Sequence, residues 1–157
     1  MTIKQVIVMR THYPDGTGGT RKVRQGKMIA QGAHASMGVL TSKFKAAMLD
    51  NQSIGFGIGW KDYNDYASGG QAQVGAANWE ALIQWVLGKF TKVVVGVQTE
   101  AELLALRDQA AAAGLPYSLI QDAGDTEFGG VPTYTALAIG PAQAERLDPI
   151  TGTLKLL

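Results

Sequence analysis

A polar turn in the C-terminal part of the sequence combines carboxylate and hydroxyl side chains. Asp122, Asp125, Thr126 and Glu127 follow the short apolar segment 118–120, so Asp122 lies where a predicted strand runs into a loop. A carboxylate there can act as a base or orient an attacking group, and neighbouring hydroxyls can position water. In open α/β sheets the strand aims such a side chain while the loop leaves it accessible. The alternative is an ordinary turn, because Asp and Thr side chains often bond to nearby backbone groups.

A second polar group lies near the N-terminus, in the segment 25–36. Lys27, Gln31 and His34 stand at positions i, i+4 and i+7 and share one stripe of a predicted helix. Another stripe of the same helix is apolar or small, so we expect that face to pack and the polar face to point toward the strand ends. A His in an Ala-rich helix is often a structural residue, and His34 is therefore predicted to support the site.

Together these residues resemble the type 2 peptidyl-tRNA hydrolases of archaea and eukaryotes. The resemblance covers most of the chain, with the region from about 49 to 78 outside it. The matching blocks, in the family's order, are Arg10-Thr11, Gly26-Lys27, Ala30-Gln31, His34-Ala35, Asp122-Ala123-Gly124 with Thr126, Thr133 with Thr135, and Leu137-Ala138-Ile139-Gly140-Pro141. The closing segment 148–157 also looks like the family's C-terminus.

This resemblance implies an enzyme that hydrolyses the ester bond between a peptide's carboxyl end and the 3'-terminal ribose of tRNA. Lys27 would neutralise the oxyanion or hold the terminal phosphate, aided by the backbone N–H groups at the start of its helix. The alternative is a Lys27–Asp122 ion pair that only ties helix to loop. The residues expected to be catalytic are Lys27, Asp122, Thr126 and Thr133. Those expected to bind substrate or support the catalytic residues are Arg10, Gln31, His34 and Thr135.

The resemblance also implies that the enzyme needs no organic cofactor, that tRNA is its partner and that it forms a homodimer. The two histidines, the absence of cysteine and the lack of a carboxylate cluster at ligand spacing argue against a structural zinc site. We therefore expect neither a cofactor nor a metal.

Positive charge is concentrated near the N-terminus. Residues 1–45 carry eight Lys or Arg side chains against the single acid Asp15, whereas the rest of the chain is net acidic. Such a patch suits a phosphate-bearing partner through charge neutralisation and counterion release. The alternative is a solvated surface loop, and the family resemblance favours nucleic acid. The residues expected to bind tRNA are Arg21, Lys22 and Arg24.

Length and composition predict a single domain over residues 1–157. A chain of this size buries roughly 70% of the surface that its unfolded form exposes, which is enough for one core. The absence of cysteine fits a reducing compartment. The apolar run 3–9 is a strand rather than a signal peptide, and no stretch approaches the length of a membrane span. We expect a cytoplasmic protein.

Alternating strand and helix patterns predict an α/β three-layer sandwich, with a four-stranded, mostly parallel or mixed sheet and helices on both faces. In the run 133–139, Tyr134, Ala136 and Ala138 are expected on one face and the other residues on the opposite face. Gly140-Pro141 is expected to end this strand. The predicted strands are 3–9, 91–97, 117–121 and 133–139. The predicted helices are 27 to about 48, 78–87 with Asn78 as cap, 99–113 with a Thr99/Glu102 capping box, and at most a short one at 142–147.

A loop-rich insert is predicted at about 50–77. Its Gly-x-Gly-x-Gly run lacks the strand and helix of a dinucleotide-binding motif. The segment is interpreted as a lid or an aromatic surface for stacking a base, with packing of its aromatics over the domain as the alternative.

Two departures from the family pattern bear on the site. The basic loop 11–25 is longer than the family's usual link, and Glu127 stands where the family more often has Gln. A second carboxylate beside Asp122 is expected to raise the pKa of Asp122 or to repel phosphate. Two other functions stay open: a non-catalytic tRNA- or protein-binding module on the same fold, and a hydrolase of a different small ester.

Overall fold

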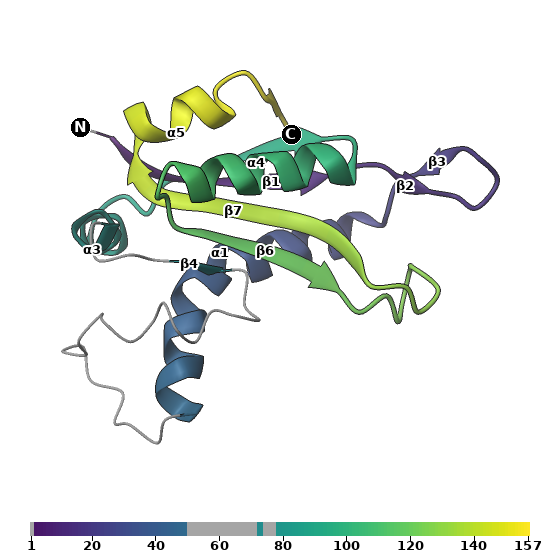
Figure 1. Cartoon of the computed structure of the whole chain (residues 1–157), viewed down its shortest axis with the longest axis horizontal. Coiled ribbons are helices and arrows are strands. Elements are labelled where there is room, and N and C mark those ends of the chain that lie inside the picture. Colours follow the sequence, from purple (N-terminus) through teal and green to yellow (C-terminus); the bar gives the residue numbers. More distant parts are fainter. Residues whose placement is uncertain (1, 50–71, 74–77) are drawn as a thin grey trace.

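The computed structural model of the chain describes residues 2–49, 72–73 and 78–157 (Figure 1). Its central sheet has the strand order β4-β6-β7-β1-β5-β8, and β2 and β3 form a separate hairpin. The strands are β1 (Ile3–Arg10), β2 (Tyr13–Pro14), β3 (Thr20–Arg21), β4 (Ala72–Gln73), β5 (Lys92–Val97), β6 (Tyr117–Asp122), β7 (Thr133–Gln143) and β8 (Lys155–Leu156). The helices are α1 (Gln25–Leu49), α3 (Trp79–Leu87), α4 (Glu100–Ala112) and α5 (Ala144–Thr151).

The sheet is mixed. Strand β1 pairs in parallel with β5 and antiparallel with β7. The pairs β6–β7, β4–β6 and β5–β8 are all antiparallel, so the mixed form of the predicted sheet is confirmed, and not the mostly parallel one. The four predicted strands correspond to the long strands β1, β5, β6 and β7, and the two-residue strands β4 and β8 extend the sheet at its edges.

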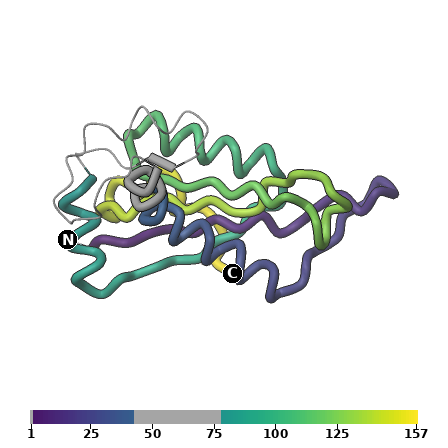
Figure 2. Tube along the Cα trace, turned by 90° about the horizontal axis from the view of Figure 1, so that it is seen from below, coloured from purple at the N-terminus to yellow at the C-terminus, as the bar shows by residue number. Residues whose placement is uncertain are grey.

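Helices cover both faces of the sheet, which confirms the three-layer sandwich (Figure 2). Alternation along β1 separates the two cores: Val6 and Val8 pack in the core with α4 and α5, whereas Ile7 and Met9 pack in the core with α1 and α3. Successive side chains of one strand thus bury apolar area on opposite sides of the sheet.

Small residues let α1 approach the sheet closely. A Cβ added to Gly38 would collide with the side chain of Ser118 on β6, and one added to Gly32 would lie 3.3 Å from the sulfur of Met9 on β1. The helix axis therefore lies close above β6, β7 and β1, which brings the polar stripe of α1 to the end of β6.

The sequence predicted the N-terminal capping of two helices, fully for α4 and only in part for α3. The Thr99/Glu102 capping box at the start of α4 is confirmed, with both reciprocal hydrogen bonds present. Asn78 occupies the N-cap position of α3, as predicted, but its side chain makes no capping hydrogen bond. Asn78 instead donates to the Gly114 carbonyl and accepts from Arg146, so its amide joins α3 to the end of α4 and to α5.

Strand β7 does not end at Gly140-Pro141, as predicted from the sequence, but runs on to Gln143. The pairing with β1 shifts register there, so that Gln5 alone stands opposite Gly140 and Pro141. Proline lacks an N–H for the ladder, and a bulge is where a strand tolerates it. Gly140 also takes a positive φ of 92° and packs against the backbone of β1.

The predicted alternation along β7 is also wrong at Tyr134 and Thr135, which lie on the faces opposite to those expected. The β6–β7 register shifts between Ile120, which pairs with Ala136, and Gln121, which pairs with Tyr134. This leaves Thr135 as an extra residue in β7. Its hydroxyl bonds to α1, on the side of the sheet where Ala136 packs, while Tyr134 packs on the α4 side.

Most of the predicted insert, residues 50–71 and 74–77, lies outside the described residues, and so do its Gly-rich run and its aromatics. Within the insert, Ala72 and Gln73 form β4 and pair with Ser118 and Tyr117. None of the helices in the described part of the chain is long and apolar enough to cross a membrane.

Candidate functional site

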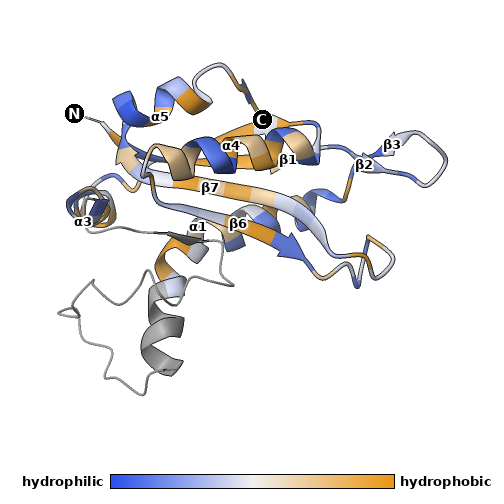
Figure 3. Ribbon diagram, viewed as in Figure 1, coloured by the Kyte–Doolittle hydropathy of each residue, from blue (hydrophilic) through white to orange (hydrophobic). Residues whose placement is uncertain are grey.

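A largely shielded ion pair joins the two polar segments. Lys27 lies in the first turn of α1, and Asp122 is the last residue of β6, where the strand changes from hydrophobic to hydrophilic (Figure 3). The Lys27 Nζ lies 2.8 Å from the Asp122 Oδ2, and each side chain is only 13% exposed. The helix start and the strand end therefore meet at one point, as the sequence predicted.

Asp122 accepts two further hydrogen bonds. The Gln31 Nε2 donates to Oδ2 at 2.7 Å, and the Gly124 backbone N–H donates to Oδ1 at 2.9 Å. A carboxylate offers about four acceptor positions. Among the described residues three are used, which leaves one acceptor position on Oδ1 for another molecule.

The pKa of Asp122 lies below its usual value. Burial acts in the opposite direction and raises the pKa, but hydrogen bonds from Lys27, Gly124 and Gln31, together with the Lys27 charge, lower it by more. The expectation that Glu127 raises the pKa of Asp122 is therefore wrong. Because Asp122 stays anionic and strongly hydrogen-bonded, it is better suited to orienting a water molecule than to acting as a strong base.

The orientation of the Gln31 amide is fixed at both ends. Its Nε2 donates to Asp122, and its Oε1 accepts from the Thr135 hydroxyl at 2.9 Å. Gln31 and Thr135 are both buried. Thr135 thus ensures that Gln31 presents its N–H groups, and not its oxygen, to the carboxylate. Of these two predicted supporting residues, Gln31 contacts the central pair directly, and Thr135 acts on it through Gln31.

Lys27 makes two more contacts with the turn that follows Asp122. Its Nζ donates to the Thr126 Oγ1 at 2.8 Å and lies 5.1 Å from the centre of the Phe128 ring. An ammonium group has three N–H donors, and Asp122 and Thr126 account for two of them. No other oxygen of the described residues accepts from it, so the third N–H remains for a negatively charged or carbonyl oxygen.

Thr133 lies beside the ion pair without bonding to it. It is the cross-strand partner of Asp122, so the two side chains share a face of the sheet. Its hydroxyl donates to the Val131 carbonyl at 2.8 Å. Of the two predicted catalytic threonines, Thr126 therefore contacts the ion pair and Thr133 borders it.

Arg10 and His34 lie apart from the central pair. Arg10 is buried, and its guanidinium donates to Glu100 at 2.8 Å and to the Tyr134 carbonyl. It thus ties the end of β1 to α4 and β7. His34 is exposed on α1, and none of the hydrogen bonds described for residues 2–42 and 78–157 links it to the ion pair. Neither residue contacts Asp122 directly.

The three basic residues predicted to bind tRNA differ in their surroundings. Arg21 donates to the Glu127 carbonyl, and Arg24 forms a 2.8 Å ion pair with the Glu127 carboxylate. Lys22 is exposed. Arg24 keeps 79% of its side chain exposed in spite of its ion pair. The Arg24 hydrogen bonds also lower the pKa of Glu127.

Sequence reasoning missed three members of the site. The Gly124 N–H binds Asp122, the Phe128 ring contacts Lys27, and Tyr13 packs on Phe128 with ring centres 4.9 Å apart. Burial raises the pKa of Tyr13 to about 12, and its hydroxyl donates to the Arg10 carbonyl. Gly124 was part of the matched Asp-Ala-Gly block, which was its only sequence signal. No spacing rule pointed to either aromatic residue.

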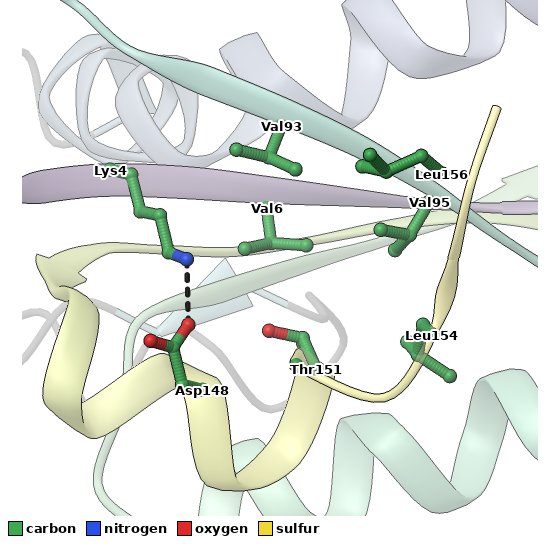
Figure 4. A pocket seen from close by; sticks show the side chains of 9 residues that line it. Lys4, Val6, Val93, Val95, Asp148, Thr151, Leu154 and Leu156 are labelled. Atoms are coloured by element: carbon green, nitrogen blue, oxygen red, sulfur yellow. Dashed lines mark hydrogen bonds and ion pairs between the residues drawn. The ribbon is translucent and has the colours of Figure 1, made fainter.

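A second Lys–Asp pair lies on the opposite side of the sheet. The Lys4 Nζ lies 2.6 Å from the Asp148 Oδ1 at the edge of a pocket of about 490 Å³ between α5 and strands β1 and β5 (Figure 4). The valines Val6, Val93 and Val95 line this pocket. In the described part of the chain, no three His, Cys, Asp or Glu side chains are grouped as a metal site.

Known proteins resemble this chain over nearly its whole length. The family model described as "Peptidyl-tRNA hydrolase PTH2" matches residues 3–157. A protein named peptidyl-tRNA hydrolase from Methanocaldococcus jannaschii is 34% identical over 155 residues, covering 99% of this chain and 100% of that protein. Proteins of the same name from Saccharolobus islandicus (strain L.S.2.15) and Saccharolobus solfataricus are 32% and 31% identical over 155 residues, each covering 99% of both chains.

Proposed function

The chain belongs to the peptidyl-tRNA hydrolase PTH2 family, and on that basis we propose that it hydrolyses the ester bond of peptidyl-tRNA at the Lys27–Asp122 pair. The reaction adds water across the ester and yields a peptide with a free carboxyl group and a tRNA with a free terminal ribose hydroxyl. The observation that carries the proposal is the convergence of Lys27, Gln31 and the Gly124 N–H on the Asp122 carboxylate.

Asp122 orients the attacking water. Its open acceptor position on Oδ1 receives a water O–H, which points a lone pair of the water toward the ester carbonyl. Asp122 stays anionic and holds the water in place. The water oxygen bonds to the carbonyl carbon, the bond from that carbon to the ribose oxygen breaks, and one water proton passes to the departing ribose oxygen. Gln31, held by Thr135, keeps the carboxylate in one orientation throughout.

Lys27 stabilises the negative charge that develops on the carbonyl oxygen. The third N–H of its ammonium group is available for this oxygen, and the N-terminal end of α1 adds a favourable dipole. Thr126 accepts from Lys27 and keeps its own O–H free to bind the water or the substrate. Thr133, the neighbour of Asp122 across the strands, borders the same water position.

The tRNA reaches this site past the basic segment. Lys22 and the exposed guanidinium of Arg24 contact phosphates, with Arg21 beside them. His34 lies on the exposed side of α1 and contacts the substrate there, whereas Arg10 acts from the core by fixing the end of β1. We also propose one domain over residues 1–157, a cytoplasmic location and a homodimer; the family resemblance supports the homodimer.

The test is hydrolysis of N-acetyl-aminoacyl-tRNA by the purified protein, by a Lys27→Ala variant and by an Asp122→Asn variant. Both variants are checked for folding by circular dichroism. An Asp148→Asn variant is the matched control, because it removes one charge from the pair on the opposite side of the sheet. We expect turnover by the wild type and the control and a loss of about 100-fold or more in the two site variants.

Turnover that is indifferent to Lys27 and Asp122 would keep the reaction and reject the site. A folded wild type that binds tRNA without turnover would indicate a non-catalytic binding module. Cleavage of a minimal ester with no dependence on tRNA would identify a hydrolase of another ester.

A further inference from the structure

The turn after β6 contacts Lys27 through two residues, and Glu127 lies between them in the sequence. Thr126 accepts a hydrogen bond from the Lys27 Nζ, and the Phe128 ring lies 5.1 Å from the same nitrogen. Thr126 is exposed. A movement of Glu127 would therefore shift these two neighbours of the catalytic lysine.

Glu127 is anchored to the segment that leads into α1. Its carboxylate accepts from the Arg24 Nε at 2.8 Å and from the Arg24 backbone N–H at 3.3 Å, and its own carbonyl accepts from Arg21. The Glu127 side chain is 10% exposed, so this contact excludes most solvent on the glutamate side. Glu127 thus joins the turn to the basic segment by bonds to its side chain and its backbone, and the Phe128 ring adds contacts with Tyr13 and Arg21.

The turn itself is a compact unit that starts at Gly124. The Phe128 and Gly130 N–H groups both donate to the Gly124 carbonyl, and the Val131 N–H donates to Phe128. Gly124 has a positive φ of 92° and lies against the backbone of Val131, where a Cβ would not fit. A turn closed in this way moves as one body, so fixing Glu127 fixes Thr126 and Phe128 together.

We infer that Glu127 is a positioning residue, which through its ion pair with Arg24 holds Thr126 and Phe128 against Lys27 in the catalytic geometry. This inference rests on the proposed function of the Lys27–Asp122 site. It gives the two departures from the family pattern a common role, because the enlarged basic loop supplies Arg21 and Arg24 and the turn supplies the glutamate that they bind. Glu127 then acts on the rate of the chemical step, and not by repelling phosphate.

The experiment compares kcat and KM for N-acetyl-aminoacyl-tRNA in the wild type, Glu127→Gln, Glu127→Ala and the double charge exchange Arg24→Glu/Glu127→Arg. We expect kcat to fall by about threefold to 30-fold in the two single variants with KM nearly unchanged, because the pair is partly exposed while misplacement of a catalytic group is costly. The double exchange recovers much of kcat. Asp148→Asn, which breaks the other partly exposed ion pair, leaves kcat unchanged.

A lower KM with unchanged kcat in Glu127→Gln would overturn the inference, since it would mean that Glu127 repels the tRNA. Amide hydrogen exchange of residues 123–131 gives a second reading that does not depend on turnover. Faster exchange in Glu127→Ala supports the inference, and unchanged exchange contradicts it. If the wild type shows no turnover, the proposed function fails, while the exchange experiment still decides whether Glu127 holds the turn.

Discussion

Two lysine–aspartate pairs of similar length lie on opposite sides of the sheet. In the Lys27–Asp122 pair the charged atoms are 2.8 Å apart and both side chains are 13% exposed. In the Lys4–Asp148 pair they are 2.6 Å apart, but 54% of the Asp148 side chain is exposed. Within the described residues, the side chains of Lys4 and Asp148 hydrogen-bond only to each other. The side chains of Lys27 and Asp122 make three further hydrogen bonds.

This comparison shows that the N–O distance alone does not identify a functional ion pair. A shorter N–O distance belongs to the pair that we place outside the chemistry. What distinguishes Lys27–Asp122 is the low exposure of both side chains combined with several donors that converge on one carboxylate, because shielding charges from water is costly unless further hydrogen bonds satisfy them. Perturbed, desolvated groups of this kind are concentrated at functional sites.

The largest expected contrast comes from neutralising each aspartate. Asp122→Asn should lower kcat/KM by about 100- to 1,000-fold, because it removes the negative charge that orients the water and balances Lys27. Asp148→Asn should leave kcat/KM within about twofold, as expected for a partly exposed pair away from the chemistry. Steady-state hydrolysis of N-acetyl-aminoacyl-tRNA measures both. Equal losses of kcat/KM in the two variants would mean that the two ion pairs do not differ in function.

A smaller difference in kcat is expected between substitutions of two buried threonines, one on each side of the sheet. Thr135→Val removes the donor to Gln31, and we expect kcat to fall by about tenfold because the Gln31 amide, and with it the Asp122 carboxylate, is then held less firmly in its orientation. Thr151→Val removes a bond to the Leu147 carbonyl near the second pair and should leave kcat unchanged. Each variant should cost about 1–3 kcal/mol of unfolding free energy. Kinetics combined with urea unfolding separates the two effects, and an unchanged kcat in Thr135→Val would limit Thr135 to a structural role.

The pH dependence of stability should single out Asp122. Its pKa is lower in the folded protein than in the unfolded chain, where it is about 3.9. The stabilisation is therefore fully present above the unfolded pKa and is lost as the pH falls through the folded pKa. In urea unfolding, the wild type and Asp122→Asn should differ in free energy of unfolding by a constant amount above about pH 5, and this difference should shrink below about pH 4. A difference that grows as the pH falls would mean that the pKa shift has the opposite sign.

The smallest effect is expected for Lys4→Ala. An ion pair with one side chain largely exposed contributes at most about 1 kcal/mol to stability and is weakened by salt. We expect Lys4→Ala to lower the free energy of unfolding, measured in urea, by no more than that amount and to leave kcat unchanged. A change in kcat after this substitution would indicate that the pocket beside Lys4 communicates with the site on the other face.

The sequence predicted the parts of the site that depend on residue type and local spacing. Lys27 and Gln31 share a helix stripe, and Asp122 ends a strand, so their meeting followed from an α/β fold. The place of Thr135 did not follow, because it depends on a register shift between β6 and β7 that no local pattern records. A simple period of two assigned it to the wrong face.

Tertiary contacts also decided what the sequence left open. Asn78 has the residue type of a helix cap, but its amide bonds to Gly114 and Arg146 from other elements. Glu127 was expected to disturb Asp122 because the two are close in sequence. In the fold its charge is paired with Arg24, about a hundred positions away, and no pattern within the turn contains that partner.

The close approach of α1 to β6 at Gly38 has a consequence for how the protein acquires its activity. The hydrogen-bonded partners that join α1 to β6, β7 and the turn between them are separated by 91 to 104 positions, and they meet only after α1 has docked on β6 and β7. Contacts of such long range form late, since their loop-closure entropy must first be overcome. Recovery of hydrolysis during refolding therefore reports the completed assembly of helix and sheet, whereas helical content alone can return before the enzyme works.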